Sequence, residues 1–134
     1  MVWDAESGEI VRKMSHPTQM DALAFSPDQK RFAEAGADKR VRIRDTETLE
    51  ILQEFRAHNG SITGIAWHPD HPILATSSED LSIRLWNLDT GERLEELHGS
   101  NSTPGELAFG PEGTRLISAD RKFHRIWEPE SLKR

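Results

Sequence analysis

The sequence predicts an all-β fold built from repeated units of four short strands, and three observations carry that prediction. Landmark residues recur with a period of roughly 42 residues along the chain. The segments between them alternate apolar and polar side chains, which is typical of half-buried strands. No segment shows the apolar spacing and capping residues of a helix.

Three sets of landmarks define the period. The aromatic set is evenly spaced and comprises Phe25, Trp67 and Phe109. The set at the end of each unit keeps the same interval to within one position and comprises Trp3, Arg44, Trp86 and Trp127. The histidine set keeps it to within two positions and comprises His16, His58 and His98. Because all three sets share one period, every unit is expected to fold in the same way.

Within a unit, the first strand runs into a Pro-Asp turn, in which proline presets φ and aspartate bonds its own backbone. A second tight turn carries Asp38 or Asp80. The expected strands of the first two units are Ala22–Ser26, Arg31–Ala35, Val41–Asp45 and Glu50–Phe55, then Gly64–Trp67, Ile73–Ser77, Ser82–Trp86 and Arg93–Leu97, with Phe123–Trp127 as a strand of the third unit.

Composition excludes several classes of function. The 134 residues include 17 Lys and Arg against 23 Asp and Glu, for a net charge of -6. We therefore expect no binding to nucleic acid or to anionic membranes. The absence of cysteine excludes disulfides, thiolate nucleophiles and thiolate metal sites. No apolar run approaches the ~18 residues of a membrane span, and the first residues lack the features of a secretory signal, so we expect a cytoplasmic location.

The repeated segments AFSPD, SIRLWN and LDTGE resemble the WD-repeat β-propeller family over nearly the whole chain. The Trp-Asp signature is present at Trp3-Asp4 and is replaced by Arg44-Asp45, Trp86-Asn87 and Trp127-Glu128 in the later units. The resemblance implies four-stranded antiparallel blades at 16–57, 58–97 and 98–134. Residues 1–15 would supply the end of a third strand and a spare fourth strand, and the last blade would lack its own fourth strand.

The resemblance also implies a hydrogen-bonded tetrad of His, Ser or Thr, Asp and Trp inside each blade. The middle unit matches at His58, Thr76, Asp80 and Trp86. The first unit keeps His16 and Asp38, with Glu34 and Arg44 in the other two places. The third unit keeps His98 and Trp127, while Asp120 is displaced by one residue. We expect these side chains to be structural, because each polar group in such a set has a partner.

Three blades are too few for a ring of about four to eight blades. An open arc would leave two blade faces and unpaired strand edges exposed to solvent. One explanation is self-assembly, in which a homodimer gives six blades or a homotrimer gives nine, and a spare N-terminal strand completes the last blade of another copy. The other explanation is that the chain is a piece of a longer propeller, which the start of the sequence inside a blade favours.

Other motifs favour structure over chemistry. The His68-Pro69-Asp70-His71 spacing fits two metal ligands, but it aligns with the strand-connecting turns of the other units. The basic stretch Lys39–Arg44 fits either a phosphate-binding surface or an ordinary alternating strand, and we favour the strand. No phosphate loop, nucleophile elbow or zinc-helix motif occurs. We therefore expect no catalytic residues, no metal and no cofactor.

The function that these observations favour is a non-catalytic protein-interaction scaffold. The resemblance implies that a protein or peptide partner binds the top face of the ring, and the matching positions are Asp21, Thr63, Glu79 and Arg121. A fold alone is weak evidence of function, so two alternatives remain. In the first alternative, the chain is a regulatory or sensor arm of a larger multidomain protein. In the second, it belongs to a propeller enzyme with carboxylate or metal chemistry in the channel.

Overall fold

The computed structural model describes residues 2–3, 10–12, 20–98, 105–120 and 124–132. The regular elements in these residues are strands, apart from one short 3₁₀ helix, η1 (Glu130–Leu132). The strands are β1 (Val2–Trp3), β2 (Ile10–Arg12), β3 (Met20–Phe25), β4 (Arg31–Gly36), β5 (Arg40–Asp45), β6 (Ile51–Arg56), β7 (Ile62–Trp67), β8 (Ile73–Ser78), β9 (Ile83–Asn87), β10 (Glu92–Leu97), β11 (Glu106–Phe109), β12 (Leu116–Ala119) and β13 (His124–Trp127).

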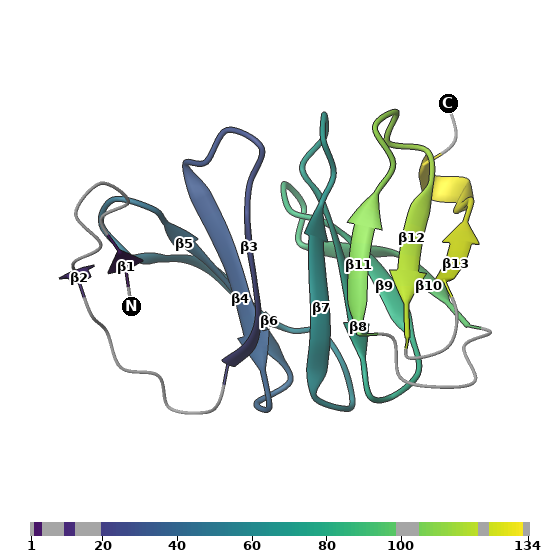
Figure 1. Cartoon of the computed structure of the whole chain (residues 1–134), viewed down its shortest axis with the longest axis horizontal. Coiled ribbons are helices and arrows are strands. Elements are labelled where there is room, and N and C mark those ends of the chain that lie inside the picture. The colour runs from purple at the N-terminus through teal and green to yellow at the C-terminus, as the bar shows by residue number, and fades with distance from the viewer. Residues whose placement is uncertain (1, 4–9, 13–19, 99–104, 121–123, 133–134) are drawn as a thin grey trace.

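Three antiparallel sheets stand side by side in chain order (Figure 1). The first sheet has the strand order β3-β4-β5-β6, the second β10-β9-β8-β7, and the third, within the described residues, β11-β12-β13. Their first strands adjoin, since β7 contacts both β3 and β11. The predicted all-β fold is confirmed, and the observed strands closely follow the expected ones.

Turns at equivalent places in the first two units are closed by equivalent hydrogen bonds. The Asp45 carboxylate accepts hydrogen bonds from the backbone N–H groups of Glu47 and Thr48 (2.8 and 2.9 Å). At the equivalent place, the Asn87 side chain accepts them from the residues two and three further on (2.9 and 3.3 Å). Side chains that bond to nearby backbone in this way stabilise tight turns, so both hairpins between third and fourth strands close alike.

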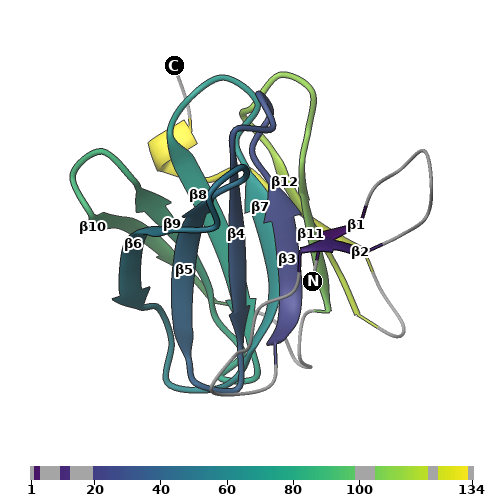
Figure 2. The ribbon, with the colours of Figure 1, turned by 90° about the vertical axis from the view of Figure 1, so that its left-hand side faces the viewer.

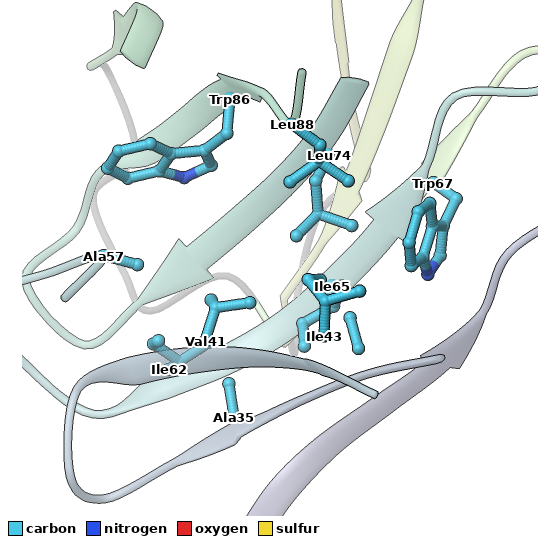
Figure 3. Packing of buried hydrophobic residues seen from close by; sticks show 11 residues of the cluster. Ala35, Val41, Ile43, Ala57, Ile62, Ile65, Trp67, Leu74, Trp86 and Leu88 are labelled. Atoms are coloured by element: carbon cyan, nitrogen blue, oxygen red, sulfur yellow. The ribbon is translucent and has the colours of Figure 1, made fainter. Parts of the chain in front are cut away.

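Apolar side chains fill the space between neighbouring sheets. The cluster between the first and second sheets is shown in Figure 3 and includes Ala33, Ala35, Val41, Ile43, Ile62, Ile65, Trp67, Leu74 and Trp86. A second cluster joins the second and third sheets and includes Ala66, Ala75, Ile83, Leu85 and Leu116. Each strand therefore contributes alternate residues to the two sides of its sheet, as the pleat requires.

The hairpin of β1 and β2 forms a separate two-stranded sheet. It lies beside the first sheet on the side away from β7 (Figure 1). Its register pairs Trp3 with Ile10. The pairs Arg44 with Ile51 and Trp86 with Arg93 have the same separation along the chain in the hairpins of third and fourth strands. The N-terminal hairpin thus has the register of a third and a fourth strand.

Candidate functional site

The structure brings the four side chains of the middle unit together inside the second sheet. His58 Nε2 lies 2.7 Å from Thr76 Oγ1, and the Trp86 indole N–H donates to that same hydroxyl (3.1 Å). On its other side, His58 Nδ1 lies 3.1 Å from Asp80 Oδ2. The chain of hydrogen bonds therefore runs from β9 through β8 to the turn that holds Asp80.

Sequence reasoning missed a fifth member, Ser82. Its hydroxyl donates to Asp80 Oδ1 (2.6 Å), its backbone N–H donates to the same oxygen (2.9 Å), and its Oγ lies 3.1 Å from His58 Nδ1. The signal was present, since a Ser two residues after an Asp is a common turn pattern. The backbone N–H of Asn59 completes the carboxylate shell (3.1 Å).

These contacts set the charge states of the site. Burial by itself would raise the pKa of Asp80, but the hydrogen bonds from Ser82 and Asn59 and the proximity of His58 lower it to about 2. Burial lowers the pKa of His58, and Asp80 offsets only part of that effect. At neutral pH the pair is therefore an ionised carboxylate beside a neutral imidazole.

The arrangement suits support rather than catalysis. His58 is 1% exposed, and both of its ring nitrogens are within hydrogen-bond distance of the protein's own groups. A general base must reach a substrate proton at hydrogen-bond distance. The second sheet has no such opening at this histidine, so its geometry is that of a rigid internal brace.

In the first sheet a buried ion pair stands where the middle unit has Thr76 and Trp86. Arg44 Nε donates to Glu34 Oε1 at 2.6 Å, and Arg44 Nη1 donates to the backbone carbonyl of Leu49 at 2.8 Å. Glu34 is 1% exposed. Removing one partner of such a pair leaves an uncompensated buried charge, which costs far more than replacing both. His16 lies outside the described residues.

Two further basic residues of Lys39–Arg44, Arg40 and Arg42, also contact carboxylates. Arg42 contacts both Asp38 and Glu54 at 2.6 Å. Asp38 Oδ1 in addition accepts the backbone N–H of Arg40 (3.2 Å). Within this stretch, Arg40–Asp45 forms β5, as the strand interpretation expected, and the side chains of Arg42 and Arg44 are paired with carboxylates.

The third sheet keeps only part of the arrangement. The Trp127 indole N–H donates to Ser118 Oγ (2.9 Å), so Ser118 takes the place of Thr76. Asp120 pairs with Arg125 at 2.8 Å. The side chain of His98 is 70% exposed and lies 3.3 Å from Glu96. The structure thus does not place His98 in a buried set like that of His58, because residue 98 stands on the surface after β10.

The His-x-x-His motif forms a turn. His68 Nε2 lies 2.9 Å from the carbonyl of Gly113, and its Nδ1 accepts the backbone N–H groups of Asp70 and His71 (3.0 Å each). With both nitrogens in use, His68 has no lone pair to offer a metal. Among the residues that the structure describes, no three acidic or histidine side chains gather in a way that holds a metal ion.

Three of the four proposed partner-binding positions lie at the same end of the sheets. Asp21 in β3 and Thr63 in β7 are each the extra residue of a β-bulge, between Met20 and Ala22 and between Ile62 and Gly64. Glu79, which follows β8, is exposed, and its backbone N–H donates to Ser61 (3.0 Å). Arg121 lies outside the described residues.

Repeats of four antiparallel strands with a His-Thr-Trp-Asp network define a class of propeller-type repeat proteins. A family model described as WD domain, G-beta repeat, matches residues 8–45 and 49–87, more than half of the chain. The chain belongs to this WD-repeat family. Its members generally bind other proteins. The described residues contain no helix with the length and apolar character of a membrane span.

Proposed function

We propose that this chain is a non-catalytic protein-interaction scaffold, which closes a propeller with further copies of itself and binds a protein or peptide on its top face. A cytoplasmic location is part of the proposal. The WD-repeat family supports the scaffold role, because its members generally bind other proteins.

The repeated bulge is the observation that carries the top-face proposal. Asp21 and Thr63 occupy equivalent bulge positions in neighbouring first strands, and Glu79 is exposed at the same end. Bulges re-aim side chains at strand ends and recur next to functional sites. Because β3 and β7 adjoin, we propose that one peptide spans these positions.

The incomplete third sheet supports self-assembly through strand exchange. Its outer strand β13 has no fourth-strand neighbour within the described residues. The hairpin of β1 and β2 has the register of a third and a fourth strand. We propose that β2 of one copy pairs with β13 of another, with Ile10 opposite Trp127, as Ile51 lies opposite Arg44. An unpaired strand edge is a template for such addition.

The top-face proposal is tested by affinity capture from cell extract with quantitative mass spectrometry. We expect Glu79→Lys to lose the proteins that the wild-type chain retains. Glu112→Lys, an equally exposed charge reversal in the turn between β11 and β12 at the opposite end, serves as the matched control. Equal loss in both variants, or no loss in Glu79→Lys, contradicts a top-face site.

A further inference from the structure

The two interfaces between sheets use opposite faces of each blade. At the first interface the second sheet presents large side chains, including Trp67, Leu74 and Trp86, to a first sheet that presents small and aliphatic ones, including Ala33, Val41 and Ile43 (Figure 3). We call these the aromatic face and the aliphatic face. The Trp67 indole N–H crosses this interface and donates to the carbonyl of Ala24 at 2.8 Å.

The second interface repeats the same polarity. The second sheet now presents its aliphatic face, with Ala75, Ile83 and Leu85, while the third sheet presents Leu116 with Phe109 and Trp127 against it. Phe109 stands one full period after Trp67 and occupies its equivalent position. Both interfaces between sheets therefore join the aliphatic face of one sheet to the aromatic face of the following sheet.

Within the described residues, one face of each kind has no three- or four-stranded sheet packed on it, and on the side of the first sheet only the two-stranded hairpin of β1 and β2 lies nearby (Figure 1). The aromatic face of the first sheet, which points toward the viewer in Figure 2, carries Leu23 and Phe25 with exposed fractions of 58% and 54%. The aliphatic face of the third sheet carries Ile117 and Ile126 with 37% and 65%. Large apolar side chains in such groups mark interaction surfaces.

Equivalent positions show what covers these side chains. Phe25 corresponds to Trp67, which is 9% exposed at its interface, and Ile126 corresponds to Ile43 and Leu85, which are both fully buried at theirs. The charged groups of the free aromatic face do not oppose docking, because Glu34 is paired with Arg44 and Arg42 with Asp38 and Glu54. Both free faces thus have the composition of one half of an interface that the chain already forms twice.

From this repetition we infer that the aromatic face of the first sheet docks on the aliphatic face of the third sheet of a second copy. The inference rests on the proposed self-assembly and names its surfaces and its direction. The contact is heterologous, since each copy uses a different patch, and it closes a ring when the rotation fits. Phe25 would then pack on the side of the second copy's third sheet that carries Ile126. Trp67 packs in the same way on the side of the first sheet that carries Ile43.

The direction is tested with two capped variants. Phe25→Arg blocks the aromatic face and leaves the aliphatic face free, while Ile126→Arg does the reverse. In a head-to-tail assembly each variant is monomeric alone, and a 1:1 mixture forms a heterodimer of twice 15.2 kDa that grows no further. Leu52→Arg, which changes an equally exposed apolar residue on the outer strand β6, is expected to assemble like the wild-type chain.

Light scattering across dilutions, with circular dichroism to verify folding, separates the outcomes. A wild-type chain that is monomeric at every concentration contradicts self-assembly, and with it this inference. A wild-type oligomer that persists in both capped variants keeps self-assembly but overturns the assignment of faces. If a capped variant dimerises alone, the contact joins like faces, and head-to-tail docking is wrong. A 1:1 mixture of the two capped variants that stays monomeric also overturns head-to-tail docking.

Discussion

Thr76 is the residue on which the buried network of the second sheet converges. Its hydroxyl serves both His58 Nε2 and the Trp86 indole, and the side chain is fully buried. A valine of the same shape would leave both groups without a partner in a place that water does not reach. A buried polar group that loses its partner costs roughly 1–3 kcal/mol.

We therefore expect Thr76→Val to lower the free energy of unfolding by roughly 1–3 kcal/mol, measured by urea denaturation. Thr90→Val is the control, because Thr90 is exposed and its lost contact with the backbone N–H of Glu92 (3.2 Å) is replaced by water. Equal stability of the two variants would contradict a bracing role for the network.

Acid should weaken the same network through Asp80. The carboxyl titrates near 3.8 in the unfolded chain and at about 2 in the folded one. The unfolded state thus binds the proton more tightly, so this contribution is complete about one pH unit above 3.8 and is lost as the pH falls toward 2. One pKa unit corresponds to about 1.4 kcal/mol, and because solvent screens this partly buried carboxylate, we expect about 1–2 kcal/mol in total.

The expected signature is a difference between two stability profiles. Wild type and Asp80→Asn are compared by urea denaturation from pH 7 to pH 2.5. The advantage of the wild type should be constant above pH 5 and should shrink below pH 4, because protonation removes the charge that the variant lacks. A pH-independent difference would show that the charge of Asp80 does not contribute.

At the scale of elements, the turn between β11 and β12 is locked onto the turn between β7 and β8. Gly113 has a φ of 77°, and a Cβ at this position would meet the ring of His68. His68 is 3% exposed and lies 2.9 Å from the carbonyl of Gly113. The close approach of the two turns therefore requires a residue without a side chain.

Gly91 provides a matched comparison, since its φ is 75° but a Cβ there would lie 3.9 Å from its nearest neighbour, Gln53. Gly91→Ala should cost about 1–2 kcal/mol from its left-handed backbone alone. We expect Gly113→Ala to cost about 1–3 kcal/mol more, because it also displaces His68. Thermal unfolding measures both, and equal costs would contradict the locked contact.

For the whole molecule, stability should depend on protein concentration. An oligomer that only the folded chain forms adds stability by mass action. We expect the Tm of the wild-type chain to fall on tenfold dilution and the Tm of Phe25→Arg to stay constant, by differential scanning fluorimetry. A wild-type Tm that is independent of concentration while light scattering shows a monomer contradicts assembly.

The sequence by itself determined the strands and their order. The repeat period and the alternation in segments such as β8 and β9 are local properties, and the observed boundaries follow them closely. The resemblance of the repeats to the WD-repeat family also pointed to His58, Thr76, Asp80 and Trp86 as a hydrogen-bonded set. The turn aspartates act on backbone groups close by in the sequence, so their role was visible in the chain alone.

Only the tertiary structure decided which groups meet across strands and sheets. Ser82 approaches His58 because the fold brings together residues that are distant along the chain. Exposure of His98 depends on where the chain leaves β10. The polarity of the interfaces depends on which side of each sheet packs on the next, a property of assembled layers that no single strand carries.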